Sequence, residues 1–467
     1  MRFECSNKLS NDGSFGLPII FTVLFQYFKF LFCHKNIYSS LYCCHITVDL
    51  YGVLLYYHNM KQRYQYRIYP TQQQQYDLAR LFGCCRVVYN DALALCRSSE
   101  KLPSNGDLQK ICITQAKKTD EREWLSEVSN IPLQQSIIDL GTSYKNFFDS
   151  FKGKRKGKKL GTPKFKKRKG KQSARFRIGG FSVKNEKLSL AKIGLIEVVW
   201  SRDLPSEASS VTVIKDAADR YFASFVVEVE PVLLPDNGQL GGSPDQKSIG
   251  IDLGIIDFAT FDTGEKIKSP KPLKQRLKKL RKAQRKHAKT DKGSKRRERA
   301  RQRVAKVHAK ISDVRKDFLH KLSTRIVREN QTIVLEDLNV SGMVKNRKLS
   351  RAISDLGWRS FRTMLEAKSV MYGRDFRVIS RWEPTSQRCS SCGEIGGKKE
   401  LGIREWECLF CGAIHDRDVN AAVNIKVAGG LPETINGRGG SRKTTTKVAA
   451  SCEASTIPLV KQLSLFH

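Results

Sequence analysis

The sequence predicts an α/β protein with an inserted metal-binding module, and three observations support this. Short apolar runs typical of strands hold or end in a carboxylate, at Asp252 and Glu336. Two basic segments between these acids space their apolar residues by three and four, as helices do. Two Cys-x-x-Cys pairs follow further along the chain. With 467 residues, the chain is long enough for two or three domains with cores of their own.

The charge balance indicates a polyanionic partner. Lys and Arg number 84 against 46 Asp and Glu, which gives a formal net charge of +38. Self-repulsion on this scale opposes compaction unless a polyanion neutralises it. A membrane surface is also anionic, but the basic residues here are spread over several segments and do not gather on one amphipathic helix. The composition therefore favours a nucleic acid.

The cysteine spacing predicts a zinc ribbon. Cys389 and Cys392 form one Cys-x-x-Cys pair, Cys408 and Cys411 form the other, and a glycine follows each pair. Buried free thiols or two disulfides are the alternatives, but paired spacings in a Lys-rich chain favour zinc. Four protein ligands leave no open position for a water, so the zinc is expected to be structural. The other cysteines, of 13 in all, show no disulfide framework, which fits a reducing cytoplasm.

Three carboxylates occur where an isolated charge is costly. Asp252 interrupts an apolar run, Glu336 ends another, and Asp418 lies in the first turn of a predicted Ala-rich helix. A divalent cation commonly compensates such buried charges. Each acid also has a purely structural interpretation, as a hairpin side chain, a capping group or an N-cap. Taken together, in the order Asp, Glu, Asp, they favour a shared magnesium site.

The motifs GIDLG, VLEDL and DRDVNAAVNI, with the two cysteine pairs, resemble the insertion-sequence OrfB/TnpB proteins, the transposon-encoded relatives of type V CRISPR effectors. The resemblance covers residues 60–430. It implies an RNase H-like nuclease core of RuvC type, with Asp252, Glu336 and Asp418 as catalytic, magnesium-binding carboxylates. It also implies that the zinc ribbon is inserted between the last two. The neighbouring Asp416 stays open as an alternative third carboxylate.

The same resemblance implies RNA-guided, metal-dependent cleavage of DNA linked to transposition. Its expected partners are a guide RNA derived from the transposon end and a double-stranded DNA target, with no membrane and no small-molecule substrate. One alternative is a transposase in the strict strand-transfer sense, whose acids usually run Asp, Asp, Glu. The other is a nucleic-acid-binding regulator that does not cut, although all three acids are intact here. The expected location is the cytoplasm of a prokaryote, associated with the nucleoid.

Composition shifts predict the domain order. Residues 1–59 are interpreted as a poorly ordered extension from an upstream start, since regular patterning begins at Met60; the apolar residues 17–33 leave a membrane anchor as the alternative. The other predicted parts are a β-barrel wedge domain (60–70 and 152–245) interrupted by a helical recognition region (71–151), the nuclease core (246–388) with a basic helical hairpin (273–322), the zinc ribbon (389–411), the last nuclease helix (412–430) and a mobile tail (431–467).

Local signals predict several individual elements. Thr71 is expected to cap a helix, and residues 262–264, Asp-Thr-Gly, to form a hairpin turn. Apolar spacing predicts one helix over residues 354–372. Cys84 and Cys85 are adjacent on a predicted helix and therefore point apart, so we expect small buried core residues there and no redox pair.

Two basic segments are the predicted nucleic-acid contacts. Residues 152–171 hold twelve Lys or Arg and no acid, with glycines and a proline that favour an extended backbone. Residues 274–310 hold 18 Lys or Arg against two acids, on two helices whose apolar residues share one seam. The candidate contacts are Lys154, Arg155, Lys156, Lys166, Lys167 and Arg168 in the first segment, and Arg281, Arg285, Arg296 and Arg297 in the second.

Overall fold

The computed structural model describes residues 46–48, 54–56, 60–155, 157–168, 170, 172–232, 234, 247–400 and 402–430. The chain divides into two compact units, Met1–Asn59 and Met60–His467. In the first unit, β1 (Ile46–Val48) pairs antiparallel with β2 (Leu54–Tyr56). The predictions for residues 17–33, for the tail 431–467 and for Lys156 lie outside the described residues.

A seven-stranded antiparallel sheet joins two segments that are distant in sequence. The first strand, β3 (Met60–Tyr69), lies between β9 (Tyr221–Val229) and β7 (Gly194–Val199). The strand order is β4-β8-β9-β3-β7-β6-β5. The remaining strands are β4 (Gln172–Arg177), β5 (Phe181–Lys184), β6 (Lys187–Leu190) and β8 (Ala208–Lys215). Residues 71–151 are thus inserted between β3 and β4, two strands of one sheet that follow each other in sequence but do not pair.

Helices make up that insertion. The long helices α2 (Gln72–Ser98) and α4 (Asn130–Phe151) pack together and against β4, with the short α3 (Asn105–Gln109) between them in sequence. Thr71 caps α2 in a capping box with Gln74, which confirms the predicted cap. Cys84 and Cys85 are buried in the core shared by helices and sheet and form no disulfide.

A second sheet holds five strands in the order β12-β11-β10-β13-β14. They are β10 (Ser248–Asp252), β11 (Ala259–Phe261), β12 (Lys266–Ile267), β13 (Thr332–Glu336) and β14 (Asp375–Ile379). The first three pair antiparallel, whereas β10, β13 and β14 are parallel. The turn between β11 and β12 contains Gly264 at φ +91°, as the hairpin signal predicted.

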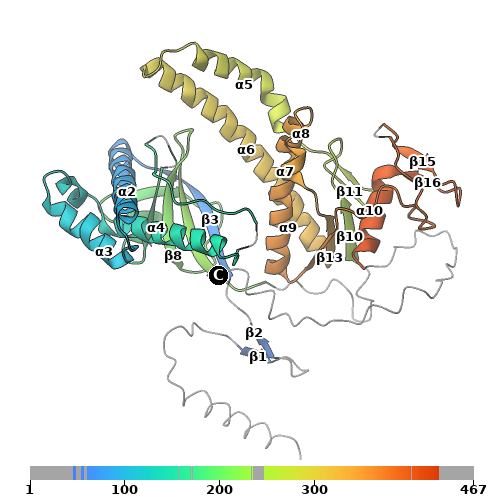
Figure 1. Cartoon of the computed structure of the whole chain (residues 1–467), viewed down its shortest axis with the longest axis horizontal. Coiled ribbons are helices and arrows are strands. Elements are labelled where there is room, and N and C mark those ends of the chain that lie inside the picture. The colour runs from blue at the N-terminus through green and yellow to red at the C-terminus, as the bar shows by residue number, and fades with distance from the viewer. Residues whose placement is uncertain are drawn as a thin grey trace, which may run out of the picture. The chain divides into compact units, whose positions relative to one another are not determined.

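Helices cover both faces of this sheet. Leu319 and Ile326 of α6 (Lys295–Glu329) and Phe361 of α9 (Trp358–Tyr372) share one core with β10 and β13. On the other face, Ile425 of α10 (Arg417–Ala428) packs against Val334. Figure 1 shows α10 beside β10 and β11, on the side opposite α9.

The basic hairpin consists of α5 (Pro272–Ala288) and α6, which run side by side (Figure 1). Its apolar seam is narrow, as the sequence predicted, and centres on Leu280, Val307 and Ile311. Ser294 caps α6 by accepting a hydrogen bond from the N–H of Arg297 at 3.1 Å.

Two boundaries differ from the sequence prediction. Residues 354–372 do not form one helix, because Gly357 adopts φ +77° and separates α8 (Ser350–Leu356) from α9. The ribbon extends beyond residue 411, because β15 (Glu405–Glu407) pairs with β16 (Ile414–Asp416), which leads directly into α10. A short helix, α7 (Val340–Met343), follows β13.

Across the described residues, none of the helices combines the length and the apolar character that crossing a membrane requires.

Candidate functional site

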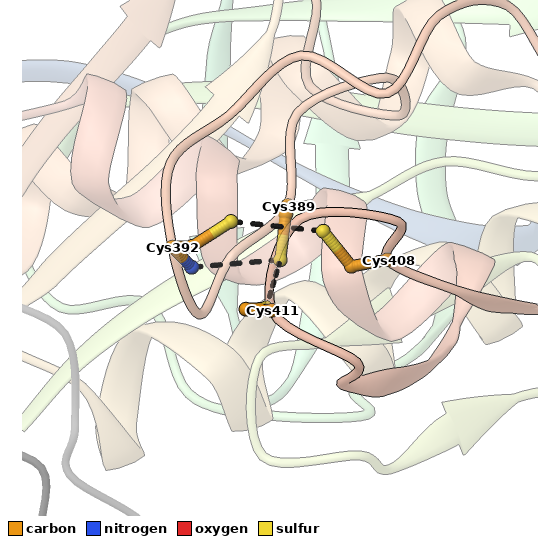
Figure 2. Close-up of side chains that lie close together, drawn as sticks. All are labelled: Cys389, Cys392, Cys408 and Cys411. Carbon is orange, nitrogen blue, oxygen red and sulfur yellow. Dashed lines mark hydrogen bonds between the residues drawn. The ribbon is translucent and has the colours of Figure 1, made fainter.

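The four ribbon cysteines bring their sulfurs together (Figure 2). All four Sγ atoms lie within 4.8 Å of one another, with 3.7 Å between Cys389 and Cys411 and 3.6 Å between Cys392 and Cys408. A zinc ion with Zn–S bonds of about 2.3 Å at the centre of a tetrahedron requires S–S edges of about 3.8 Å. The residues therefore fit a structural zinc ion.

Each cysteine pair is shaped by the same kind of turn. The N–H of Gly393 donates to the carbonyl of Cys389 at 2.9 Å, and the N–H of Gly412 donates to the carbonyl of Cys408 at 2.8 Å. Both glycines have positive φ, +82° and +69°, a conformation that other residues rarely adopt. For Cys408, burial raises the thiol pKa, but hydrogen bonds from two backbone N–H groups and from neighbouring cysteine side chains outweigh it, so that the pKa falls to about 7. This favours the thiolate that a metal requires at Cys408. Burial raises the thiol pKa of Cys389 and of Cys392 in the metal-free cluster.

Asp252 and Glu336 lie at the carboxyl ends of two adjacent parallel strands, β10 and β13. Side chains alternate along a strand, so Asp252 points in the same direction as Gly250, and Glu336 in the same direction as Val334. Gly250 and Val334 both face α10. The two acids therefore project toward the helix that bears Asp418 in its first turn.

The pKa of Asp252 reflects the negative charges of the two neighbouring acids. Burial, followed by the negative charges of Asp418 and Glu336, raises the pKa of Asp252 from its ordinary value to about 7. Burial, followed by the charge of Asp337, also raises the pKa of Glu336. The structure thus brings the three sequence-predicted carboxylates into one electrostatic group.

The carboxylates are less tightly clustered than the cysteines. Among the described residues, only the four cysteines form a group of three or more metal-ligand side chains with all ligand atoms within 4.8 Å. A two-cation centre, with ions about 3.5–4 Å apart, spreads its ligands over a wider space. Carboxylate oxygens are also the ligand type that magnesium prefers. The donor set thus fits magnesium.

Asp416 has a different environment from Asp418. It is the N-cap of α10, where one carboxylate oxygen accepts the N–H groups of Asp418 at 3.1 Å and Val419 at 3.0 Å. Its other oxygen pairs with Lys266 at 2.5 Å. Burial opposes its ionisation, but these partners lower the pKa of Asp416 below its ordinary value. Both oxygens are thus engaged by the protein. The charge of Asp418 is among the causes that raise the pKa of Asp252, which favours Asp418 as the third acid of this group.

Three family models match parts of this chain. They are described as "Probable transposase" for residues 224–347, "Cas12f1-like, TNB domain" for residues 358–425 and "Helix-turn-helix domain" for residues 60–101. A Streptomyces pristinaespiralis protein, "Putative RNA-guided DNA endonuclease", is 45% identical over 79% of this chain and 90% of its own length. The chain belongs to the OrfB/TnpB family. The resemblance predicted from its motifs is thereby confirmed.

Other relatives of this TnpB-family chain are more distant. InsQ of Escherichia coli K12, with the same description, is 29% identical over 79% of this chain and 92% of its own. The TnpB-like protein L79 of Acanthamoeba polyphaga mimivirus is 26% identical over 78% of this chain and 73% of its own. A solved Cas12f1–sgRNA–target DNA complex aligns with a TM-score of 0.47 at 13% identity, over 79% of this chain and 98% of the Cas12f1 chain.

Two arginines that the sequence did not single out adjoin the acids of the TnpB-family site. Arg404, in the ribbon, places Nη1 3.3 Å from an oxygen of Asp418. The charge of Arg417 lowers the pKa of Asp252, against the larger effects that raise it. Arg404 lies in a ribbon of mixed charge and Arg417 at the start of α10, and neither position carries a periodic signal, so residue spacing could not predict these interactions.

Asp337, the residue after Glu336, is held by two further arginines. Arg381 and Arg362 both form salt bridges with its carboxylate, and these bonds hold the pKa of Asp337 below its ordinary value. Arg381 lies two residues after the end of β14, and Arg362 lies on α9. The end of β13 is thus tied to β14 and α9 immediately beside Glu336.

The predicted contacts in residues 152–171 lie mostly on the surface. Lys154, Arg155, Lys167 and Arg168 are exposed. Lys166 is more engaged with the protein: its N–H donates to Asn90 at 2.8 Å, its ammonium lies 3.8 Å from the centre of the Tyr89 ring, and burial lowers its pKa.

The hairpin also presents a basic surface. Arg281, Arg285 and Arg296 are exposed. Arg297 is partly buried and donates to the carbonyl oxygens of His287, at 3.3 Å, and Thr290. The first three side chains are therefore available to phosphates, whereas Arg297 also stabilises the turn between α5 and α6.

Proposed function

We propose that this chain is an RNA-guided DNA endonuclease of an insertion sequence that hydrolyses phosphodiester bonds with magnesium. The observation that carries the proposal is the joint position of Asp252, Glu336 and Asp418 beside α10, where burial, followed by the charges of the other two acids, raises the pKa of Asp252 to about 7. The strand order of the five-stranded sheet supports an RNase H-like core of RuvC type. The descriptions of the relatives agree with this activity.

The three acids would hold the cations, and the protein shapes the site around them. Bound magnesium supplies an activated water and stabilises the leaving 3′ oxygen during in-line displacement. Asp252 must lose its proton before it can act as a ligand, which its pKa of about 7 permits near neutrality. Arg404 pairs with Asp418 in the metal-free site. The guanidinium of Arg404 would also be suited to bind a phosphate of the DNA beside these acids.

Zinc would act by fixing the chain ahead of the catalytic helix. The ribbon strand β16 ends at Asp416, and α10 begins at the next residue. The N–H of Arg417 also donates to the carbonyl of Arg404 at 2.7 Å, which joins the first turn of α10 to the ribbon. A folded ribbon therefore determines the direction in which Asp418 enters the site.

Guide RNA and double-stranded target DNA are the proposed partners. The exposed cations of residues 152–171 and of the hairpin are suited to phosphate contacts, which fix register without reading sequence. A cavity of about 400 Å³ beside the seven-stranded sheet is lined by Arg63, Lys166 and Arg175, which adds positive charge to the wedge domain. We expect the protein to act in the prokaryotic cytoplasm, near the nucleoid.

The test is to express the full chain and, in parallel, residues 60–467, and to sequence the RNA that co-purifies. DNA that matches one end of this RNA should be cut in the presence of Mg²⁺. Asp252→Ala should bind the same RNA and DNA without cutting. A purified protein that carries no RNA, or cutting that persists in Asp252→Ala, would contradict the proposal. Binding by the wild type without any cutting would indicate the regulator instead.

A further inference from the structure

The backbone of α10 lies very close to the sheet at Gly250, in the middle of β10. A Cβ atom at this position would lie 2.2 Å from the carbonyl oxygen of Ala422 and 2.8 Å from the Cβ of Lys426. Both separations are shorter than real Cβ atoms show. Only glycine therefore allows the backbone of α10 to rest directly on β10.

A buried ion pair crosses the same contact. Lys426 Nζ lies 2.9 Å from Asp262 Oδ2, and the two side chains are only 2% and 1% exposed. Asp262 is in turn bonded to β10, because its Oδ1 accepts the N–H of Gly250 at 3.1 Å and its own N–H donates to the Gly250 carbonyl at 3.1 Å. Asp262 therefore connects the backbone of β10 to the side chain of Lys426.

A buried ion pair is an expensive way to attach a helix. Both charges must be desolvated, and well-packed apolar residues often stabilise a fold at least as well. What the pair adds is direction, since an ammonium and a carboxylate at 2.9 Å allow little sliding of one element along another. The ion pair is therefore better suited to holding α10 at one position on β10 than to adding stability.

The residue spacing on α10 and on β10 shows which other side chains this contact holds in place. Asp418, Ala422 and Lys426 are four residues apart on α10 and share one face of the helix. Lys426 lies two helical turns, about 12 Å, from Asp418. On β10, Gly250 and Asp252 are two residues apart and share one face of the strand. The contact that fixes Ala422 and Lys426 over Gly250 therefore also fixes Asp418 relative to Asp252.

We propose that Gly250, Asp262 and Lys426 form a positioning clamp, which sets the separation of the Asp418 and Asp252 carboxylates and thereby the affinity of the site for divalent cations. The clamp residues act through α10 and β10 and do not contact the cations. This inference rests on the proposed nuclease function, in which these two carboxylates bind metal. A role limited to fold stability would leave the cation affinity of a folded variant unchanged.

The test compares full-length wild type with the double variant Asp262→Asn/Lys426→Met. The double variant removes both charges together, so no unpaired buried charge remains, and the Asn oxygen can still accept the N–H of Gly250. Mn²⁺ binding is measured by electron paramagnetic resonance on the protein with its co-purified RNA. We expect Mn²⁺ affinity to fall by about 10- to 100-fold, the range seen when residues that orient metal ligands are removed.

A second variant, Gly250→Ala, keeps the ion pair and forces α10 away from β10 by one methyl group. It too should bind Mn²⁺ more weakly while it retains RNA. In cleavage assays, both variants should need more Mg²⁺ for half-maximal rate and recover much of the wild-type rate at saturating Mg²⁺. Wild-type Mn²⁺ affinity in either folded variant would overturn the clamp.

The variant Asp252→Ala distinguishes a failure of the clamp proposal from a failure of the proposed nuclease function. If wild type binds Mn²⁺, and Asp252→Ala does not, yet wild type cuts no DNA, the nuclease proposal fails while the Mn²⁺ comparison still tests the clamp. If wild type cuts DNA and the clamp variants show unchanged metal dependence, the clamp fails while the nuclease proposal stands.

Discussion

The cysteine cluster and the carboxylate site differ in how the chain assembles them. The four cysteines lie within residues 389–411, where contacts inside one short segment bring their sulfurs within 4.8 Å. The three acids come from β10, β13 and α10, and burial, followed by the charges of Asp418 and Glu336, raises the pKa of Asp252. A site built within one short segment forms when that segment folds, whereas one built by sheet and helix packing depends on long-range contacts. Removing a ligand from each site tests this difference.

The largest effect is expected at the acids. Asp252→Ala should reduce Mg²⁺-dependent DNA cleavage by at least about 1,000-fold, because it removes a metal ligand and not merely a residue that orients one. Zinc content, measured by atomic emission, should stay at the wild-type value. Loss of zinc from Asp252→Ala would contradict the independence of the two sites.

The neighbouring acids provide a matched pair. Asp418→Asn should be nearly as inactive as Asp252→Ala. Asp416→Asn should retain most activity, because Asn also caps helices well and only the bond to Lys266 is weakened. The reverse order of activities would make Asp416 the third metal ligand.

The next largest effect is expected in the ribbon. Cys408→Ser should abolish zinc binding and reduce cleavage by about 100-fold, because the segment that directs α10 loses its tether. Cys112→Ser, a buried cysteine of the helical region, is the matched control and should keep its zinc. Full cleavage activity in a zinc-free Cys408→Ser protein would show that the ribbon does not position Asp418.

A smaller effect is expected from pH at the acids. Protons and cations compete for Asp252, so Mn²⁺ affinity should fall about tenfold for each pH unit below 7 and level off above it. In the metal-free protein, the same raised pKa should lower the free energy of unfolding as the pH rises from 3.8 toward about 7, because the folded state binds this proton more tightly. Isothermal titration calorimetry and urea unfolding would measure these two changes, and a pH-independent Mn²⁺ affinity would contradict them.

The smallest effect is expected in the basic hairpin, outside the cysteine cluster and the carboxylate site. Arg281→Ala/Arg285→Ala should reduce the slope of log affinity for guide RNA against log salt by about 1.4–1.8, the value for two lost phosphate contacts. Lys321→Ala, an exposed residue of α6 that pairs with Asp317, is the control and should leave the slope unchanged. Filter binding at several salt concentrations would show both results.

The features predicted correctly from the sequence are those that short sequence motifs determine. The capping box at Thr71, the hairpin turn at Gly264 and the cysteine spacing each depend on a few adjacent residues, and the structure confirms all three. The helix break at Gly357 was missed, because apolar spacing continues across it while the backbone turns left-handed.

Residue spacing in the sequence could not predict contacts between distant segments. Asp262 and Lys426 are 164 residues apart, and each reads as an ordinary surface residue in its own segment. Arg404 likewise reaches Asp418 only through the fold of the ribbon. The motifs indicated which acids belong to the site, but not the contacts that hold them in place.

The most direct test is to locate Mn²⁺ by anomalous scattering in crystals of the protein bound to its RNA and a matching DNA. Manganese peaks are expected within bonding distance of carboxylate oxygens of Asp252, Glu336 and Asp418, with a phosphate of the DNA beside them. Peaks that avoid these three residues, or that lie only at Asp416, would contradict this expectation.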